Sequence, residues 1–156
     1  MTVLAARLLS PPTRDALQSD CVALIHQHIE QRKGLRGLAM RTGISLLKTL
    51  RADAVERGVE KLLPGFVSAM EPLHADFRKQ DDGDFSQFLQ QHSDRAARKL
   101  LQVSDETVAQ SGQRTIQTAY AQLRRFAESE LTTVLPQVGQ MIESRLAQPP
   151  AEGFPG

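Results

Sequence analysis

Aromatic residues and cysteine are scarce in this chain, and both shortages exclude kinds of protein. Aromatic residues make up 4% of the 156 residues, with no tryptophan, so few rings are present to stack on bases or on a flat cofactor. Cys21 is the only cysteine, which excludes an intrachain disulfide and a cysteine-rich zinc site. The core must therefore be built from Leu, Val, Ile and Ala, which suits closely packed helices.

Excess charge and long apolar runs are also lacking. Nineteen basic residues balance eighteen acidic ones to a formal net charge of +1, so the overall charge does not indicate a polyanionic partner. No run approaches the ~18 apolar residues that a membrane span needs. The stretch Val3–Leu9 is too short for a signal-peptide core and is interrupted by Arg7. We therefore expect a soluble, cytoplasmic protein without a transmembrane segment.

Apolar residues recur at steps of three and four along nearly the whole chain, which is typical of amphipathic helices. Pro64, Pro72 and Pro136 fall within these stripes, where a proline removes a backbone donor and crowds the preceding turn. We predict an all-α fold, a compact bundle of about six to eight helices, some of them kinked at proline. A single domain should cover residues 1–147, and the Pro- and Gly-rich residues 148–156 should form a disordered tail.

Reactive side chains form no recognisable catalytic or metal-binding set. Cys21 and His28 share a helix face but lie ~10.5 Å apart along its axis, too far for a base to activate the thiol. We interpret Cys21 as a small buried hydrophobic residue. Glu71 and His74 have the spacing of a di-iron bundle ligand pair, but such a site needs a second pair and two further glutamates. We therefore predict no catalytic residue, no metal ligand, no cofactor and no enzymatic activity.

One segment has a pronounced charge bias. Residues 31–52 contain no acid, and in a helix their leucines fall largely opposite their cations. Such a helix can bind an anionic membrane or nucleic acid, or its cations can form a solvated surface over apolar neighbours. The residues of this candidate anion-binding face are Lys33, Arg36, Arg41, Lys48 and Arg51.

The segment Leu38–Ser45 is similar to the turn of a helix-turn-helix repressor, with Gly43 at the turn. A break there would bare Leu46 and Leu47 to DNA, although groove-facing positions need hydrogen-bonding groups. One continuous helix avoids this problem. We therefore expect a continuous helix that buries Leu46 and Leu50 and exposes the cations.

Several short segments with packing and turn signals are spread over most of the chain. They are Gly34–Ala39, Leu62–Val67, Asp84-Phe85, Ser93–Asp105 and Leu135-Pro136. In these segments the chain resembles, from about residue 3 to residue 147, a family of bacterial all-helical proteins catalogued as a domain of unknown function. The resemblance implies a helical fold and assigns no catalytic or binding residue.

Three functions remain open for such a helical protein. We predict a non-enzymatic interaction protein whose partner is a protein, either a second copy or another chain. The first alternative is a carrier that holds a lipid or another apolar small molecule in the bundle core. The second is a binder of DNA or an anionic membrane surface through the basic helix 32–51, with nucleic acid the less favoured partner.

Overall fold

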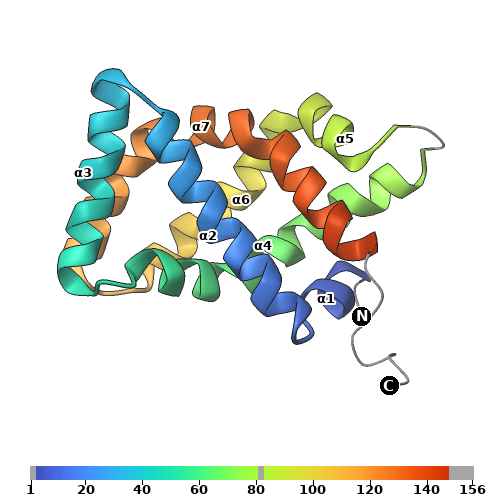
Figure 1. The fold of residues 1–156 in the computed structure, drawn as a ribbon, viewed down its shortest axis with the longest axis horizontal. Coiled ribbons are helices and arrows are strands. Elements are labelled where there is room, and N and C mark those ends of the chain that lie inside the picture. Colours follow the sequence, from blue (N-terminus) through green and yellow to red (C-terminus); the bar gives the residue numbers. More distant parts are fainter. Residues whose placement is uncertain (1–2, 81–82, 148–156) are drawn as a thin grey trace.

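The computed structural model describes residues 3–80 and 83–147, and this part of the chain contains seven α-helices and no strand. The predicted all-α bundle is therefore confirmed (Figure 1). The predicted tail, residues 148–156, lies outside the described residues. The helices are α1 (Val3–Leu8), α2 (Thr13–Gln31), α3 (Gly34–Leu50), α4 (Ala54–Arg78), α5 (Phe85–Gln91), α6 (Ser93–Ala109) and α7 (Arg114–Ala147).

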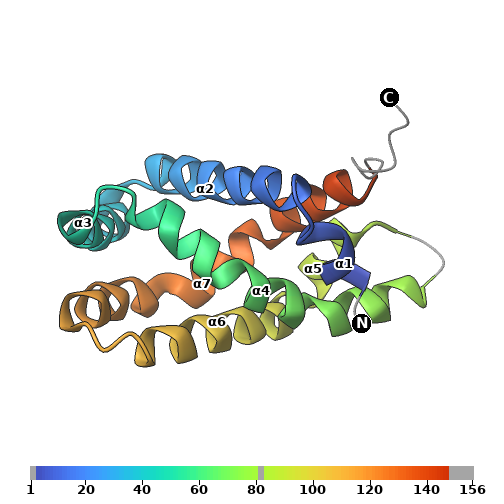
Figure 2. The same ribbon diagram turned by 90° about the horizontal axis from the view of Figure 1, so that it is seen from below.

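The prolines predicted to interrupt helices lie inside two long ones. Pro64 and Pro72 are within α4 and Pro136 is within α7, and both helices continue past them. Figures 1 and 2 show that α7 bends: its N-terminal half lies beside α3, and its C-terminal half runs back along the molecule. A proline inside a helix removes one backbone hydrogen bond and so permits such a bend.

The main hydrophobic core lies where α1 and α5 meet α4, α6 and the C-terminal half of α7. Close packing there depends partly on Gly139, because a Cβ at this position would lie 2.7 Å from the Cα of Ser86. No residue of α3 belongs to this core. Its buried members are Leu4, Leu8, Leu17, Leu63, Val67, Met70, Leu73, Phe85, Phe88, Leu89, Ala96, Ala97, Leu100, Leu135 and Ile142.

Helix α3 is continuous, so the break at Gly43 that a helix-turn-helix requires is not present. The predicted burial of its leucines is wrong, however. Leu50 is 48% exposed and Leu46 is only half-buried. The residues that α3 buries are Gly37, Met40 and Gly43.

Close helix packing explains why glycine rather than leucine lies on the inner side of α3. A Cβ on Gly43 would lie 2.8 Å from Cγ of Leu123 in α7, and one on Gly37 would lie 2.1 Å from the carbonyl oxygen of Arg32. A leucine at either position would force the elements apart. Small residues allow the close approach, and the leucines of α3 consequently face away from it.

Candidate functional site

Helix α3 and the N-terminal half of α7 lie side by side at one end of the molecule (Figures 1 and 2). Within the described residues, three of the four exposed large hydrophobic side chains belong to α3: Leu35 at 86%, Leu38 at 56% and Leu50 at 48%. Exposed apolar side chains gathered on one helix are a candidate interaction surface. We call Leu35, Leu38, Leu46 and Leu50 the leucine face.

The opposite side of α3 is oriented by a buried acid that the sequence analysis missed. Glu130 of α7 is only 7% exposed. Its Oε1 accepts hydrogen bonds from His28, from Arg32 Nε at 3.0 Å and from Arg32 Nη2 at 2.8 Å. Its Oε2 accepts one from Arg36 Nη1 at 3.0 Å. These four residues, the Glu130 cluster, join the end of α2 and the start of α3 to the middle of α7.

Electrostatics within the Glu130 cluster favour the ionised carboxylate. Burial alone would raise the pKa of Glu130, but hydrogen bonds from His28, Arg32 and Arg36 outweigh it and hold the pKa below its ordinary value. The Arg36 guanidinium also lies over the ring of Phe126, 5.1 Å from its centroid. The start of α3 is therefore held against α7 by charge as well as by close packing.

The five cations predicted to bind anions do not converge on one site. Arg36 is held by Glu130, Arg51 pairs with Asp53 at 2.9 Å, and Arg41 Nη1 donates to the carbonyl oxygen of Arg32 at 3.2 Å. Lys33 and Lys48 form no ion pair within the described residues. Anion binding by these residues stays a prediction.

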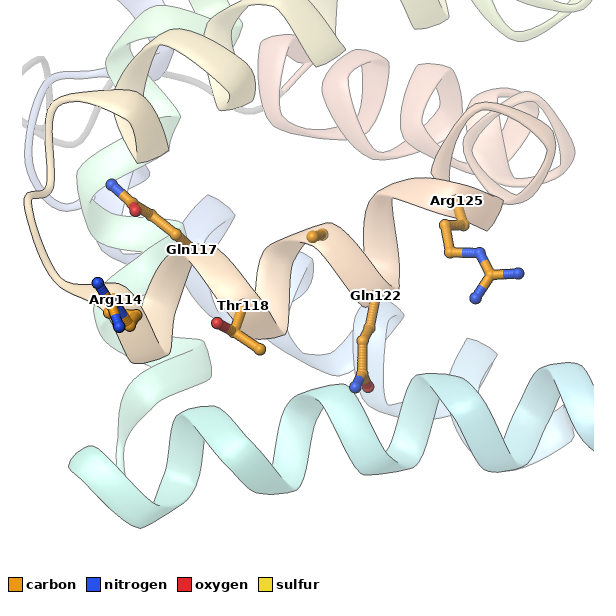
Figure 3. A pocket seen from close by; sticks show the side chains of 6 residues that line it. Arg114, Gln117, Thr118, Gln122 and Arg125 are labelled. Carbon is orange, nitrogen blue, oxygen red and sulfur yellow. The ribbon is translucent and has the colours of Figure 1, made fainter.

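A shallow groove of about 420 Å³ runs along the outer side of α7 next to α3 (Figure 3). Arg114 and Arg125 mark its ends and lie ~16 Å apart along the helix axis. Figure 3 shows the side chain of Gln122 pointing toward α3. None of the lining residues is acidic: Arg114, Gln117, Thr118, Ala121, Gln122 and Arg125.

A second, polar cleft of about 270 Å³ lies between α2 and α7, beside the Glu130 cluster. Both hollows described here open on the outside of the bundle and carry polar side chains. Neither is an apolar chamber in the core, so the hypothesis of an apolar carrier stays untested. The lining residues of the cleft are Leu24, Gln27, His28, Gln31, Arg32, Thr133, Val134 and Gln137.

The side chains considered for catalysis or metal binding have structural contacts. Burial and, to a lesser extent, the charge of Asp20 raise the pKa of Cys21 to about 11, so its thiol is a poor nucleophile. Glu71 accepts the backbone N–H of Ala5 at 2.8 Å. The ring of His74 packs edge-on to another ring of the core. In the described part of the chain, no cluster of three or more histidine, cysteine or acidic residues is arranged to hold a metal ion.

One comparison with known proteins places the chain in a family. The model of a family of unknown function (DUF6918) matches residues 4–146, and the chain belongs to that family. No curated protein and no solved structure shows significant similarity to it. No helix in the described part of the chain has the length and apolarity that a bilayer span requires.

Proposed function

We propose that this chain is a non-enzymatic interaction protein of the cytoplasm, and that α3 docks a different protein through its leucine face. The observation that carries the proposal is the exposure of Leu35 at 86% and Leu38 at 56%, on a helix whose inner side is already packed. Covering these side chains would gain about 25 cal/mol for each Å² of apolar surface removed from water. A cytoplasmic location is supported by a lone cysteine that has no partner for a disulfide within the chain.

Charge argues against a second copy as the occupant. The exposed cations of α3 include Arg41 and Lys48, and the helix contains no acid. A two-fold pairing of α3 with α3 of a second copy would place like charges side by side along the contact between the two helices, which is unfavourable. A partner of opposite charge avoids this repulsion.

A protein partner also fits the surface better than a membrane or nucleic acid does. Interfacial helices typically place Trp, Phe or Leu in the membrane and free cations around them. Helix α3 has leucines but no aromatic residue, and although Lys33 and Lys48 are unpaired among the described residues, Arg36 and Arg51 are held in ion pairs. Nucleic acid is bound through cations on the phosphates and hydrogen-bonding groups on the bases. The outward side of α3 presents leucines instead.

A photo-crosslinking residue at position 38 tests the proposal. Position 3 provides the matched control, because Val3 is 48% exposed, close to the 56% of Leu38, but lies on α1. We expect position 38, and not position 3, to cross-link one other protein in cells. The purified pair should then bind, and Leu35→Ser with Leu38→Ser should abolish binding while Val3→Ser leaves it unchanged.

Other results would contradict the proposal. Cross-links from position 38 to a second copy of this chain would replace the different partner by self-association. Cross-links to lipid alone would make α3 a membrane-binding helix. If Leu35→Ser with Leu38→Ser left the affinity of the cross-linked protein unchanged, the leucine face would not be the docking surface.

A further inference from the structure

We infer that the partner docks with a single acidic amphipathic helix, laid along α3 with its apolar side on the leucine face. This inference rests on the proposed function and names the element of the partner that the surface fits. Three features of the surface carry it: the spacing of its apolar positions, the charge along its first flank and the charge along its second flank.

The outward positions of α3 recur at helical spacing. Leu35, Leu38, Thr42, Leu46 and Thr49 succeed one another at steps of three, four, four and three residues, so that in a heptad register Leu46 takes position e and Ser45 takes position d. Both threonine hydroxyls donate to carbonyl oxygens of α3 itself, at 2.9 Å to Leu38 and 2.6 Å to Leu46. Their donor needs are met within the helix, which leaves the methyl groups to join the apolar seam. This apolar seam is ~21 Å long and offers a partner helix a strip to pack along.

The first flank of this seam is basic. With Leu35 and Thr42 at heptad position a, Arg41 and Lys48 both fall at position g, one heptad apart, and both are exposed. Side chains at e and g face the partner helix and determine which charges it carries. Glutamate or aspartate on the facing side of the partner would pair with both cations.

The second flank faces α7. Around the circumference of α3, Gly43 lies next to Leu46 and Leu50, and it contacts Leu123 of α7. Beyond this contact lies the groove that Arg114 and Arg125 bound. The groove lining has no acid. A helix in the seam would therefore meet cations on both sides.

One acid of α7 lies close to this edge. Glu128 follows Arg125 by three residues, whereas no acid lines the groove and none belongs to α3. The occupant therefore meets a surface that is apolar along its centre and basic along both edges. An acidic amphipathic helix is complementary to both parts.

Two synthetic helical peptides of the length of α3 provide the test. Both carry leucine at every a and d position; one carries glutamate and the other lysine at every e and g position. We expect the purified protein to bind the glutamate peptide about tenfold or more tightly than the lysine peptide, with the difference shrinking as salt is added. Fluorescence anisotropy at low and high salt measures both affinities.

Charge-reversal variants locate the effect on the two flanks. Arg41→Glu with Lys48→Glu, and separately Arg114→Glu with Arg125→Glu, should each weaken the glutamate peptide about tenfold. Lys61→Glu on α4 and Arg98→Glu on α6 reverse exposed cations elsewhere and should leave the affinity unchanged. Circular dichroism checks that every variant remains helical.

The outcomes separate this inference from the proposed function. Equal binding of both peptides, lost in Leu35→Ser with Leu38→Ser, would overturn the acidic helix while the docking surface stands. If the cross-linked partner bound both charge-reversal variants as tightly as the wild type, the acidic helix would likewise be overturned while the docking surface stands. If Leu35→Ser with Leu38→Ser left binding of the glutamate peptide unchanged, both the acidic helix and the docking surface would be overturned, because charge alone would then hold the peptide. Binding of vesicles rich in phosphatidylglycerol, with neither peptide bound, would favour a membrane.

Discussion

Helices α3 and α6 are both 17 residues long and both pack against α7, yet they use their leucines in opposite ways. Helix α6 buries Leu100 and Leu101 together with two alanines, as its apolar stripe predicts. Helix α3 buries Gly37, Met40 and Gly43 and leaves Leu35 outside.

The difference shows what an apolar stripe can and cannot indicate. In α6, the leucines are the only apolar side, so they face the core. In α3, a second side contains two glycines that allow close packing, Gly43 against Leu123 of α7 and Gly37 against the carbonyl oxygen of Arg32, and Arg36 reaches the buried Glu130. When a helix has two sides that can pack, the stripe alone does not determine which one is buried.

The largest expected effect contrasts the two sets of leucines. Leu100→Ala removes a side chain that is 4% exposed and should lower the free energy of unfolding by about 2–5 kcal/mol. Leu35→Ala, at 86% exposure, should change it by less than about 0.5 kcal/mol. Urea denaturation of both variants measures the difference. Equal losses would mean that α3 packs its leucines in solution.

Next in size is the close approach at the start of α3. Gly37→Ala places a Cβ against the carbonyl oxygen of Arg32 and should destabilise the protein by about 1–3 kcal/mol. Gly58→Ala in α4 meets nothing within 4 Å and should stabilise it by about 0.5–1 kcal/mol, because alanine favours the helix. Thermal unfolding should move the two variants in opposite directions. A stable Gly37→Ala variant would contradict the tight packing.

Glu130→Gln tests the charge that holds α3. We expect a loss of about 1–2 kcal/mol near neutral pH, reduced because the arginine partners are partly solvated. The folded pKa of Glu130 lies below its unfolded value, so its contribution is present above about pH 4.3 and disappears as the pH falls through the folded pKa.

Denaturation curves across acid pH provide the readout for Glu130→Gln. The wild type and the variant should converge in stability at low pH, and Asp105→Asn on α6 serves as the control. Asp105 pairs with Arg124 at 3.0 Å and accepts a hydrogen bond from the Tyr120 hydroxyl, but its side chain is 45% exposed, so its replacement should cost less. A constant gap between wild type and Glu130→Gln down to low pH would contradict the role of the ionised carboxylate.

The smallest effect concerns the thiol that packs against the main core. Because burial and Asp20 raise the pKa of Cys21 to about 11, very little thiolate is present at pH 8. Reaction with a disulfide reagent should be slow in the folded protein and fast in urea. Rapid labelling without denaturant would show that this part of α2 opens readily.

The sequence predicted the helical class, the stripes of α4 and α6 and the continuity of α3, because these depend on local periodicity. The direction of α3 depends on long-range contacts, such as Gly43 with Leu123, which periodicity cannot reveal. Glu130 carried a signal that was missed: it is spaced four residues from Phe126 and from Val134, within the apolar side of α7. An acid in such a position predicts a buried partner, and the acid-free segment 31–52 supplies two of its cations.

The outward direction of the α3 leucines is tested most directly by thiol labelling of single cysteines placed on α3. In a Cys21→Ala background, Leu38→Cys and Met40→Cys lie two positions apart but on opposite sides of the helix. We predict that the thiol at position 38 reacts about a hundredfold or more faster than the thiol at position 40, which must wait for local opening. Faster reaction at position 40 would mean that the leucines point inward, and the docking surface would not exist.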